Sequence, residues 1–237
     1  MARAKSRFLR RRIASGIAAG AVVLLSACQS VSQSQTTSLV RLVDASYNAP
    51  AVDVYAGKTE IARDVSAGTI TRYAILAPGA VTITVDATGT KKTLATLTAT
   101  LQAAEQHSVY LTDAGSGIDA KLLKDRAESS PVGDFSVRFL QAAHATGAVD
   151  VYYLAAGEAV KDATPVVRGL QAGQDSGYVD VPDGTYSLVV TRAGSTEPIF
   201  MGSSVTYAGG EVRTVLIQDE PAVHGRPLQV LVGDDQN

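Results

Sequence analysis

The chain has 237 residues, with 21 Lys and Arg against 23 Asp and Glu, three His and a formal net charge of −2. Tryptophan is absent and aromatic residues make up only 5% of the chain, so the composition does not predict a wide aromatic platform for binding sugars. The single cysteine excludes an intrachain disulfide, and the stability of the fold must therefore come from packing.

The first 27 residues contain the parts of an export signal in their usual order. A basic stretch without acidic residues comes first, and a mainly apolar stretch from Ile13 to Leu25 follows. This apolar stretch is too short to span a bilayer comfortably, because a transmembrane helix needs about 20 such residues. We therefore expect export by general secretion and removal of residues 1–27. The arginines at 10–12 leave twin-arginine export as the alternative.

The only cysteine, Cys28, ends the run Leu25-Ser26-Ala27-Cys28. This run resembles the cleavage site of bacterial lipoproteins, in which the new N-terminal cysteine carries acyl chains. The resemblance implies a lipid anchor (palmitate) on Cys28 that holds the protein in the cell envelope, facing the periplasm or the cell surface. Gln29 in the next position resembles lipoproteins that are sorted to the outer membrane.

Removal of the signal would make the protein acidic. Six of the basic residues precede Cys28, which leaves 15 basic against 23 acidic residues and a formal charge of −8. Nucleic acids and anionic membrane surfaces are bound through clustered Lys and Arg. We therefore expect no nucleic acid partner, and contact with the membrane through the lipid anchor. The polar residues that follow, to position 38, are typical of a flexible tether.

The rest of the chain is a tandem repeat. Val40-Arg41-Leu42-Val43 aligns with Val137-Arg138-Phe139-Leu140, and residues 51–55 align with residues 148–152, both at an offset of 97. The offset grows to 105 and then to 106 further along the chain. The second copy has therefore gained residues around positions 155–165, where we expect a longer loop, since the entropy of loop closure grows only slowly with length.

Both copies show the alternation of apolar and polar residues that is typical of β-strands, for example at 81–85, 95–101 and 186–191. Residues 120–128 have a helix-like composition, but their place in the repeat matches residues 228–232, so we expect a strand there. The sequence predicts an all-β protein with two tandem antiparallel β-sandwiches of immunoglobulin-like or transthyretin-like type. They are placed at residues 39–126 and 135–233, with a linker at 127–134 and a tail at 234–237.

Two segments of the first copy, residues 40–55 and 78–85, resemble the bacterial domain-of-unknown-function family 4397. The resemblance covers nearly all of residues 39–232, and it implies exported tandem β-sandwiches without an established activity. The second copy has His144-Ala145-Thr146-Gly147 where the first has Tyr47-Asn48-Ala49-Pro50. Since loops on a rigid scaffold commonly carry recognition, the predicted contact residues are Asp44, Tyr47, Asn48 and His144. The alternative is that these loops only connect strands.

Asp53 and Asp150 recur in apolar strands, where aspartate is disfavoured. We expect each to form a cross-strand ion pair with the repeated arginine, Arg41 with Asp53 and Arg138 with Asp150. Such a pair contributes about 0.2 to 1 kcal/mol when it is exposed. We therefore interpret these aspartates as partners in structural ion pairs and not as ligand-binding residues.

No motif in the chain predicts catalysis or metal binding. Asp44, Asn48 and Asp53 lack the spacing of a calcium loop, the three histidines (His107, His144 and His224) lack the spacing of a zinc site, and Gly115-Ser116-Gly117 lacks the context of a nucleophile elbow. We expect no cofactor. The predicted function is a non-catalytic structural or binding module of the envelope whose partner is a protein or a glycan. The alternative is an envelope hydrolase with a site at the domain junction.

Overall fold

The computed structural model describes residues 36–219 and 228–236, which belong to one compact unit of residues 33–237. The expected signal peptide, Cys28, the tether up to residue 35 and His224 lie outside the described residues. Within the described part of the chain, no helix is long and apolar enough to cross a membrane.

The strands fall into two groups, which we call the first repeat (β1–β9) and the second repeat (β10–β17). The strands of the first repeat are β1 (Ser38–Ala45), β2 (Val52–Ala56), β3 (Thr59–Val65), β4 (Thr69–Ile70), β5 (Ala74–Leu76), β6 (Gly79–Ala87), β7 (Thr93–Leu101), β8 (Gln106–Ala114) and β9 (Gly117–Asp125). The strands of the second repeat are β10 (Asp134–Gln141), β11 (Val149–Leu154), β12 (Val167–Leu170), β13 (Asp175–Pro182), β14 (Gly184–Arg192), β15 (Pro198–Tyr207), β16 (Val212–Asp219) and β17 (Leu228–Asp234). The predicted strands at 81–85, 95–101, 120–128 and 186–191 all correspond to observed strands.

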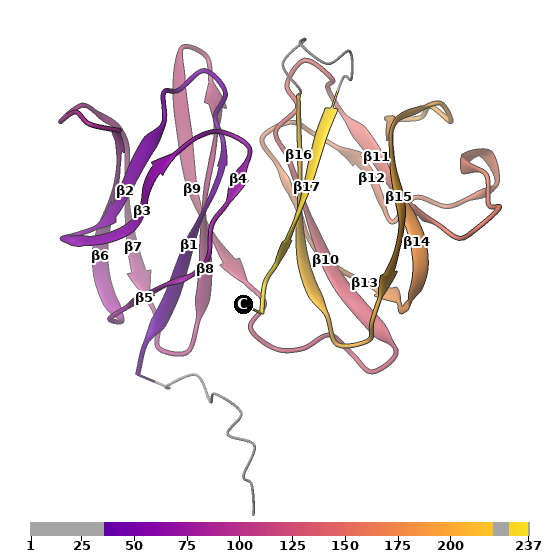
Figure 1. Cartoon of the computed structure of the whole chain (residues 1–237), viewed down its shortest axis with the longest axis horizontal. Helices are drawn as coiled ribbons and strands as arrows, with labels where there is room; N and C mark the ends of the chain where they lie inside the picture. Colours follow the sequence, from indigo (N-terminus) through magenta and orange to yellow (C-terminus); the bar gives the residue numbers. More distant parts are fainter. Residues whose placement is uncertain (1–35, 220–227, 237) are drawn as a thin grey trace, which may run out of the picture. The chain divides into compact units, whose positions relative to one another are not determined.

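Each repeat contains two sheets (Figure 1). In the first repeat the strand orders are β4-β1-β8-β9, with β5 also paired to β1, and β3-β2-β6-β7. In the second repeat they are β13-β10-β16-β17 and β12-β11-β14-β15. The two repeats thus have matching orders, and the predicted all-β sandwich class is confirmed. The sheets are antiparallel as predicted, apart from the parallel pairs β1–β8 and β10–β16.

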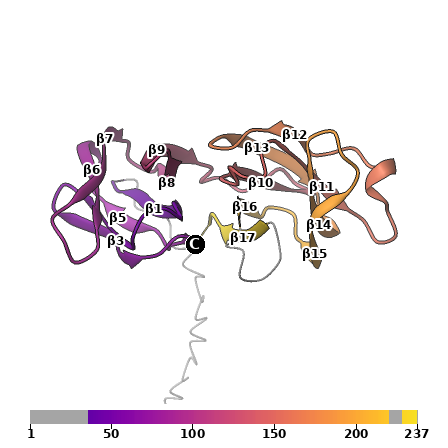
Figure 2. The ribbon, with the colours of Figure 1, turned by 90° about the horizontal axis from the view of Figure 1, so that it is seen from above.

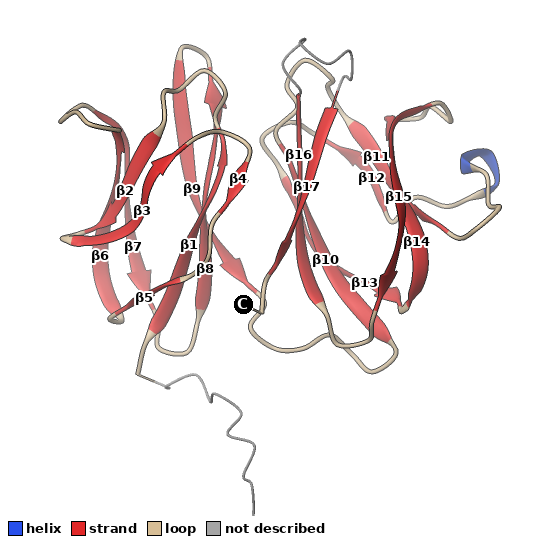
Figure 3. Ribbon diagram, viewed as in Figure 1, coloured by secondary structure: helices blue, strands red, loops and turns tan. Residues whose placement is uncertain are grey.

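The longer loop of the second repeat lies between β11 and β12. It contains the one described helical element, a short 3-10 turn at Val160–Asp162 (Figure 3). Val160 of this turn is buried and packs with Tyr152, Leu154 and Val189. The inserted residues therefore form a loop, as the alignment of the two copies predicts, and part of the loop is fixed by apolar packing.

Each repeat has its own hydrophobic core between its two sheets. In the first repeat this core includes Val40, Leu42, Val54 and Ile83, all fully buried. In the second repeat Phe135 stacks on Tyr207 with ring centroids 4.4 Å apart. The second core therefore uses aromatic rings where the first uses aliphatic side chains.

A third apolar cluster joins the two repeats. It consists of Val43, Ala45, Tyr110, Leu140, Ala142 and Leu216, with Ile70, Leu123 and Leu231 packed against it. These residues come from the sheets that contain β1 and β10, which we call the junction sheets. Since successive residues of a strand point to opposite faces, β1 buries Leu42 in the core of its repeat and Val43 at the junction. Figure 2 gives a second view of these strands.

Candidate functional site

Arg41 is buried in the middle of the junction, with a relative exposure of 1%. Its Nη2 donates to Asp235 Oδ1 at 2.5 Å and to Thr214 Oγ1 at 3.1 Å. Its Nε donates to Ser108 Oγ at 2.9 Å and lies 3.7 Å from Asp125 Oδ2. An arginine of the first repeat is therefore neutralised mainly by an aspartate of the second.

The second repeat provides the reciprocal contact. Arg138 occupies the position equivalent to Arg41, and its Nη2 donates to Asp125 Oδ1 at 2.7 Å. Asp125 lies opposite Gln106 at the end of β9, and Asp235 N donates to the carbonyl oxygen of Val212 just after β17. Each arginine thus pairs across the junction with the other repeat's aspartate. We call these four buried residues the junction ion-pair cluster.

Two tyrosines also donate hydrogen bonds to the aspartates of the cluster. Tyr73 donates to Asp125 Oδ2 at 2.6 Å, and Tyr178 donates to Asp235 Oδ2 at 2.6 Å. The guanidinium of Arg41 lies 4.7 Å from the ring centroid of Tyr73, and that of Arg138 lies 4.9 Å from the ring centroid of Tyr178. Burial raises the pKa of both phenols, so both remain hydrogen-bond donors at neutral pH.

The carboxylates also set the charge of the arginines. Burial is the largest influence on the pKa of Arg41 and lowers it, but Asp235, Tyr73 and Asp125 together outweigh burial, and the pKa is raised. For Arg138 the pKa is raised in the same way, with burial outweighed by Asp125, Tyr178 and Asp235 together. The cluster therefore holds two positive and two negative charges in a region that water does not reach, where the geometry must satisfy them.

The predicted pairs Arg41–Asp53 and Arg138–Asp150 are wrong. Asp53 lies in β2 of the other sheet of its repeat, where its Oδ1 accepts from Asp64 N at 2.8 Å and from Thr88 Oγ1 at 3.0 Å. Asp150 likewise accepts from the backbone N–H of Gly169 and of Gly194. These aspartates fix the backbone of neighbouring loops, because the first two strands of each repeat separate into different sheets.

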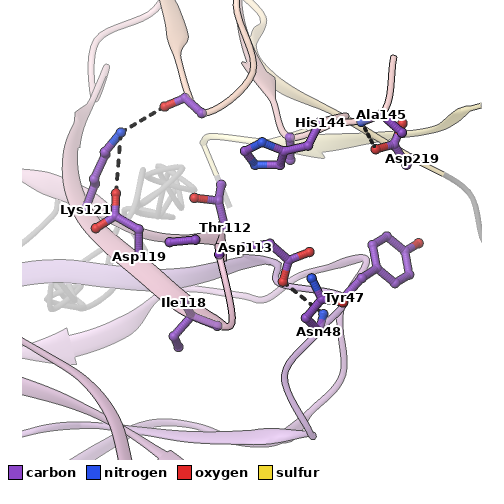
Figure 4. A pocket seen from close by; sticks show the side chains of 14 residues that line it. Tyr47, Asn48, Thr112, Asp113, Ile118, Asp119, Lys121, His144, Ala145 and Asp219 are labelled. Atoms are coloured by element: carbon purple, nitrogen blue, oxygen red, sulfur yellow. Dashed lines mark hydrogen bonds and ion pairs between the residues drawn. The ribbon is translucent and has the colours of Figure 1, made fainter. Parts of the chain in front are cut away.

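A separate groove at the junction has a volume of about 940 Å³ (Figure 4). Its lining comes from both repeats. The residues are Tyr47, Asn48, Thr112, Asp113, Ala114, Gly115, Ile118, Asp119 and Lys121 of the first repeat, and Ala142, His144, Ala145, Gly173 and Asp219 of the second. Three of the four predicted contact residues, Tyr47, Asn48 and His144, therefore line one groove, although His144 lies 97 residues after Tyr47 in the sequence.

The two loops at the groove are fixed in the same way. Asn48 N donates to Asp113 Oδ1 at 2.9 Å, and the equivalent Ala145 N donates to Asp219 Oδ2 at 2.7 Å. Asp219 Oδ1 also accepts from Thr146 Oγ1 at 3.0 Å. Each repeat thus uses an aspartate at the end of its junction sheet to hold the loop that faces the groove.

The first loop is also bonded to the second repeat. Tyr47 OH donates to Gln229 Oε1 at 2.9 Å and accepts from Gln218 Nε2 at 3.1 Å. On the other side of the groove, Lys121 Nζ donates to the carbonyl oxygen of Gly173 at 2.9 Å and lies 3.6 Å from Asp119. The groove therefore has walls that are connected by hydrogen bonds across the junction.

The fourth predicted contact residue, Asp44, is buried behind the first loop. Its Oδ1 accepts from Ser46 N at 2.9 Å and from Ser46 Oγ at 2.5 Å, and its Oδ2 has no partner among the described residues. Burial raises the pKa of Asp44, the bonds from Ser46 oppose this change, and the charge of Asp113 adds to it. Asp44 is therefore a residue that shapes the loop and does not line the groove.

Sequence reasoning missed the aspartates of the cluster, Asp125 and Asp235, and the groove residues Asp113, Asp219 and Lys121. One signal for the cluster is present in the sequence. A strand with apolar residues on both sides of Arg41, repeated around Arg138, indicates an arginine inside a strand that is buried on both faces. Within the described residues, no group of three or more His, Cys, Asp or Glu side chains could hold a metal ion.

The fold and the groove define the chain as a tandem β-sandwich protein in which both repeats contribute to one depression. Residues 38–152 match the family described as "Domain of unknown function (DUF4397)". This match confirms the resemblance seen in the sequence over these residues. The match covers the whole first repeat and extends into β11 of the second.

Other comparisons give little. No curated protein matches the chain significantly. A family 26 carbohydrate-binding module of Amy13K from Eubacterium rectale, in complex with maltoheptaose, is 9% identical, with 83% of this chain and 96% of that chain covered and a TM-score of 0.23. A protein provisionally described as a cell adhesion protein, from Parabacteroides distasonis, is 9% identical, with 85% and 99% covered and a TM-score of 0.21. At these scores neither likeness carries an argument about this chain.

Proposed function

We propose that this protein is a non-catalytic binding module of the bacterial cell envelope, and that it binds its partner in the groove shared by the two repeats. One observation carries the proposal. The loop around Tyr47 and Asn48 and its equivalent around His144 and Ala145 line the same groove. Binding sites are commonly concave and are built from loops on a rigid scaffold.

The contacts of the groove carboxylates favour binding over a junction hydrolase. Asp113 and Asp219 accept hydrogen bonds from loop backbone, and Asp119 pairs with Lys121. These bonds hold the walls of the groove in place. Hydrolysis would require a positioned pair of acid and base or a nucleophile with its base, and the described hydrogen bonds connect His144 to no carboxylate or hydroxyl group. The hydrolase remains the second candidate because the groove does lie at the junction.

The envelope location rests on Cys28 and the residues before it. In this proposal acyl chains on Cys28 anchor the mature protein, and the following polar residues separate the folded repeats from the membrane. Fractionation of cells that express the chain tests the anchor. The parent protein is expected in the membrane fraction, and the Cys28→Ser variant outside it. Equal membrane retention of both proteins would contradict lipid anchoring.

The groove is tested by retention of an envelope partner. The bait is the chain with Cys28→Ser, so that membrane recruitment through lipid plays no part. We expect that the further changes Tyr47→Ala and Asn48→Ala reduce retention of the partner at least about fivefold, since truncation at the centre of an interface costs more than about 1 kcal/mol. The matched control replaces Ser203 and Thr206, which are exposed on β15, by alanine. Equal retention by all three baits would contradict the proposal.

A further inference from the structure

Among the described residues that line the groove, carboxylates outnumber positively charged side chains. Asp113, Asp119 and Asp219 line it, against Lys121 as the one Lys or Arg in the lining. Lys121 is engaged by Asp119 and by the carbonyl oxygen of Gly173. Among the described residues, no ion pair involves Asp113 or Asp219. Two carboxylates, one from each repeat, therefore face the same groove without an ion pair to any described residue.

These two carboxylates are fixed before any ligand arrives. The bonds from Asn48 N and Ala145 N hold them against their loops. The charge of Asp113 also acts on another acid, Asp44, whose pKa rises through burial and, to a smaller extent, through the charge of Asp113. A fixed anionic group in a hollow attracts cations without a cost of reorganisation. The groove is therefore complementary to a ligand with positive charge.

The depression continues beyond the groove. A second hollow of about 240 Å³ shares Asn48 and Ile118 with it. This hollow is lined by Pro50, Leu94 and other residues of the same end of the first repeat. Asn48 and Ile118 thus line both hollows, and Asn48 is exposed. A compact ligand would fill one hollow, whereas an extended chain would cross both.

We propose that the groove binds an extended polypeptide segment that carries lysine or arginine, presented by another protein of the envelope. This inference rests on the proposed function and names its ligand class. Lys and Arg carry a positive charge at the end of a long apolar stem. In the proposed complex the charge pairs with the carboxylates of the groove, and the stem packs on apolar side chains of the adjoining hollow. A nucleic acid would be repelled by the same carboxylates, and an uncharged glycan would gain nothing from their charge.

The test uses the chain with Cys28→Ser and a fluorescein-labelled pentalysine peptide as the probe, followed by fluorescence anisotropy. We expect saturable binding that weakens as salt is added, because salt screens exposed charges. Pentaglutamate and a Gly-Ser pentapeptide are expected not to bind. Lysine amide is expected to bind more weakly than pentalysine, since it cannot cross both hollows. Equal binding of lysine amide would overturn the extended ligand.

Two substitutions test whether pentalysine binds at the carboxylates of the groove. Asp113→Asn and Asp219→Asn keep an oxygen acceptor for the loop N–H and remove the charge. Each is expected to weaken pentalysine binding about two- to fivefold, and both together about tenfold. The matched control, Glu60→Gln with Glu128→Gln, removes two exposed charges outside the groove and is expected to leave binding unchanged. Equal weakening by the control pair would overturn the site.

The outcomes separate this inference from the proposed function. Absence of pentalysine binding, together with a partner that is lost on Tyr47→Ala and Asn48→Ala, would overturn the cationic ligand and leave the groove as the binding site. Absence of both would overturn the two proposals together. Pentalysine binding that depends on Asp113 and Asp219 would support both.

Discussion

Arg41 and Asp235 lie 194 residues apart in the chain, and their side chains meet at 2.5 Å in the interior of the protein. The equivalent of Arg41 in the second repeat is Arg138, and the equivalent of Asp235 in the first repeat is Asp125. These two side chains meet at 2.7 Å. The contact is therefore isologous, as in a two-fold dimer where residue i touches j and j touches i, although here one chain supplies both halves. This relationship joins the two repeats through buried charges.

Loss of one arginine from the junction ion-pair cluster is expected to destabilise the protein strongly. Arg138→Ala leaves Asp125 buried without its closest cation, and such a change costs about 3 to 5 kcal/mol. Urea unfolding measures the effect as a change in the free energy of unfolding. The control is Arg168→Ala, which removes an exposed arginine and is expected to stay within about 0.5 kcal/mol of the parent. A similar result for both variants would contradict the importance of the cluster.

Two equivalent glycines are expected to differ in their tolerance of alanine. Gly68 and Gly173 both have positive φ, +80° and +78°, so alanine is strained at either position. A Cβ on Gly68 would also lie 2.8 Å from Gln218 Nε2 and 3.2 Å from Gln229 Oε1, whereas a Cβ on Gly173 has nothing within 4 Å. We therefore expect Gly173→Ala to cost about 1 to 2 kcal/mol and Gly68→Ala to cost more. Thermal unfolding of the two variants compares them, and an equal loss would argue against the close approach.

Asp44 is expected to make the protein less stable as the pH rises. Its pKa is raised in the folded state by burial, so the folded protein holds this proton more tightly than the unfolded chain does. The stability from this group is present below the ordinary aspartate pKa of about 3.9 and falls as the pH rises through the raised value. Asp44→Asn is therefore expected to gain stability over the parent between acid and neutral pH. Urea midpoints measured across that range check the trend, and a constant difference would contradict it.

Asp53 is expected to behave in the opposite way. The hydrogen bond from Asp64 N is the largest cause of its lowered pKa. The folded state therefore favours the ionised carboxylate, and its contribution is present above the ordinary aspartate pKa and is lost as the pH falls through the lowered value. Asp53→Asn should lose stability at neutral pH and approach the parent in acid. The same urea series, with Asp86→Asn as the control, measures this change, and a loss that persists unchanged in acid would count against it.

Much of the fold could be predicted from local patterns. The alternation at residues 81–85 and 95–101 predicts β6 and β7, and the equivalence of 120–128 with 228–232 predicts a strand at β9 despite its helix-like composition. The partners of Arg41 could not be predicted in this way. Alternation within a strand indicates two faces, but it does not say which sheet will cover the second face. Local reasoning therefore paired Arg41 with Asp53 when the true partner lies at the other end of the chain.

The groove was predicted only as two separate loops. The sequence predicts Tyr47 and His144 as contact residues because they occupy equivalent loops of the two repeats. Their meeting in one site depends on the junction, which is built from contacts between residues far apart in sequence, such as Tyr47 with Gln229. Asp113 and Asp219 are equivalent at an offset of 106, but their role as acceptors for loop N–H groups depends on side-chain geometry that no spacing rule gives.

Photo-crosslinking from both loops tests most directly the claim that they form one binding groove. Benzoylphenylalanine is placed singly at Asn48, at Ala145 or, as a control, at Ser203 on β15, in the Cys28→Ser chain mixed with envelope protein, and adducts are identified by mass spectrometry. The account predicts that positions 48 and 145 capture the same partner and that position 203 does not. Different partners at the two loops, or equal capture from position 203, would contradict it.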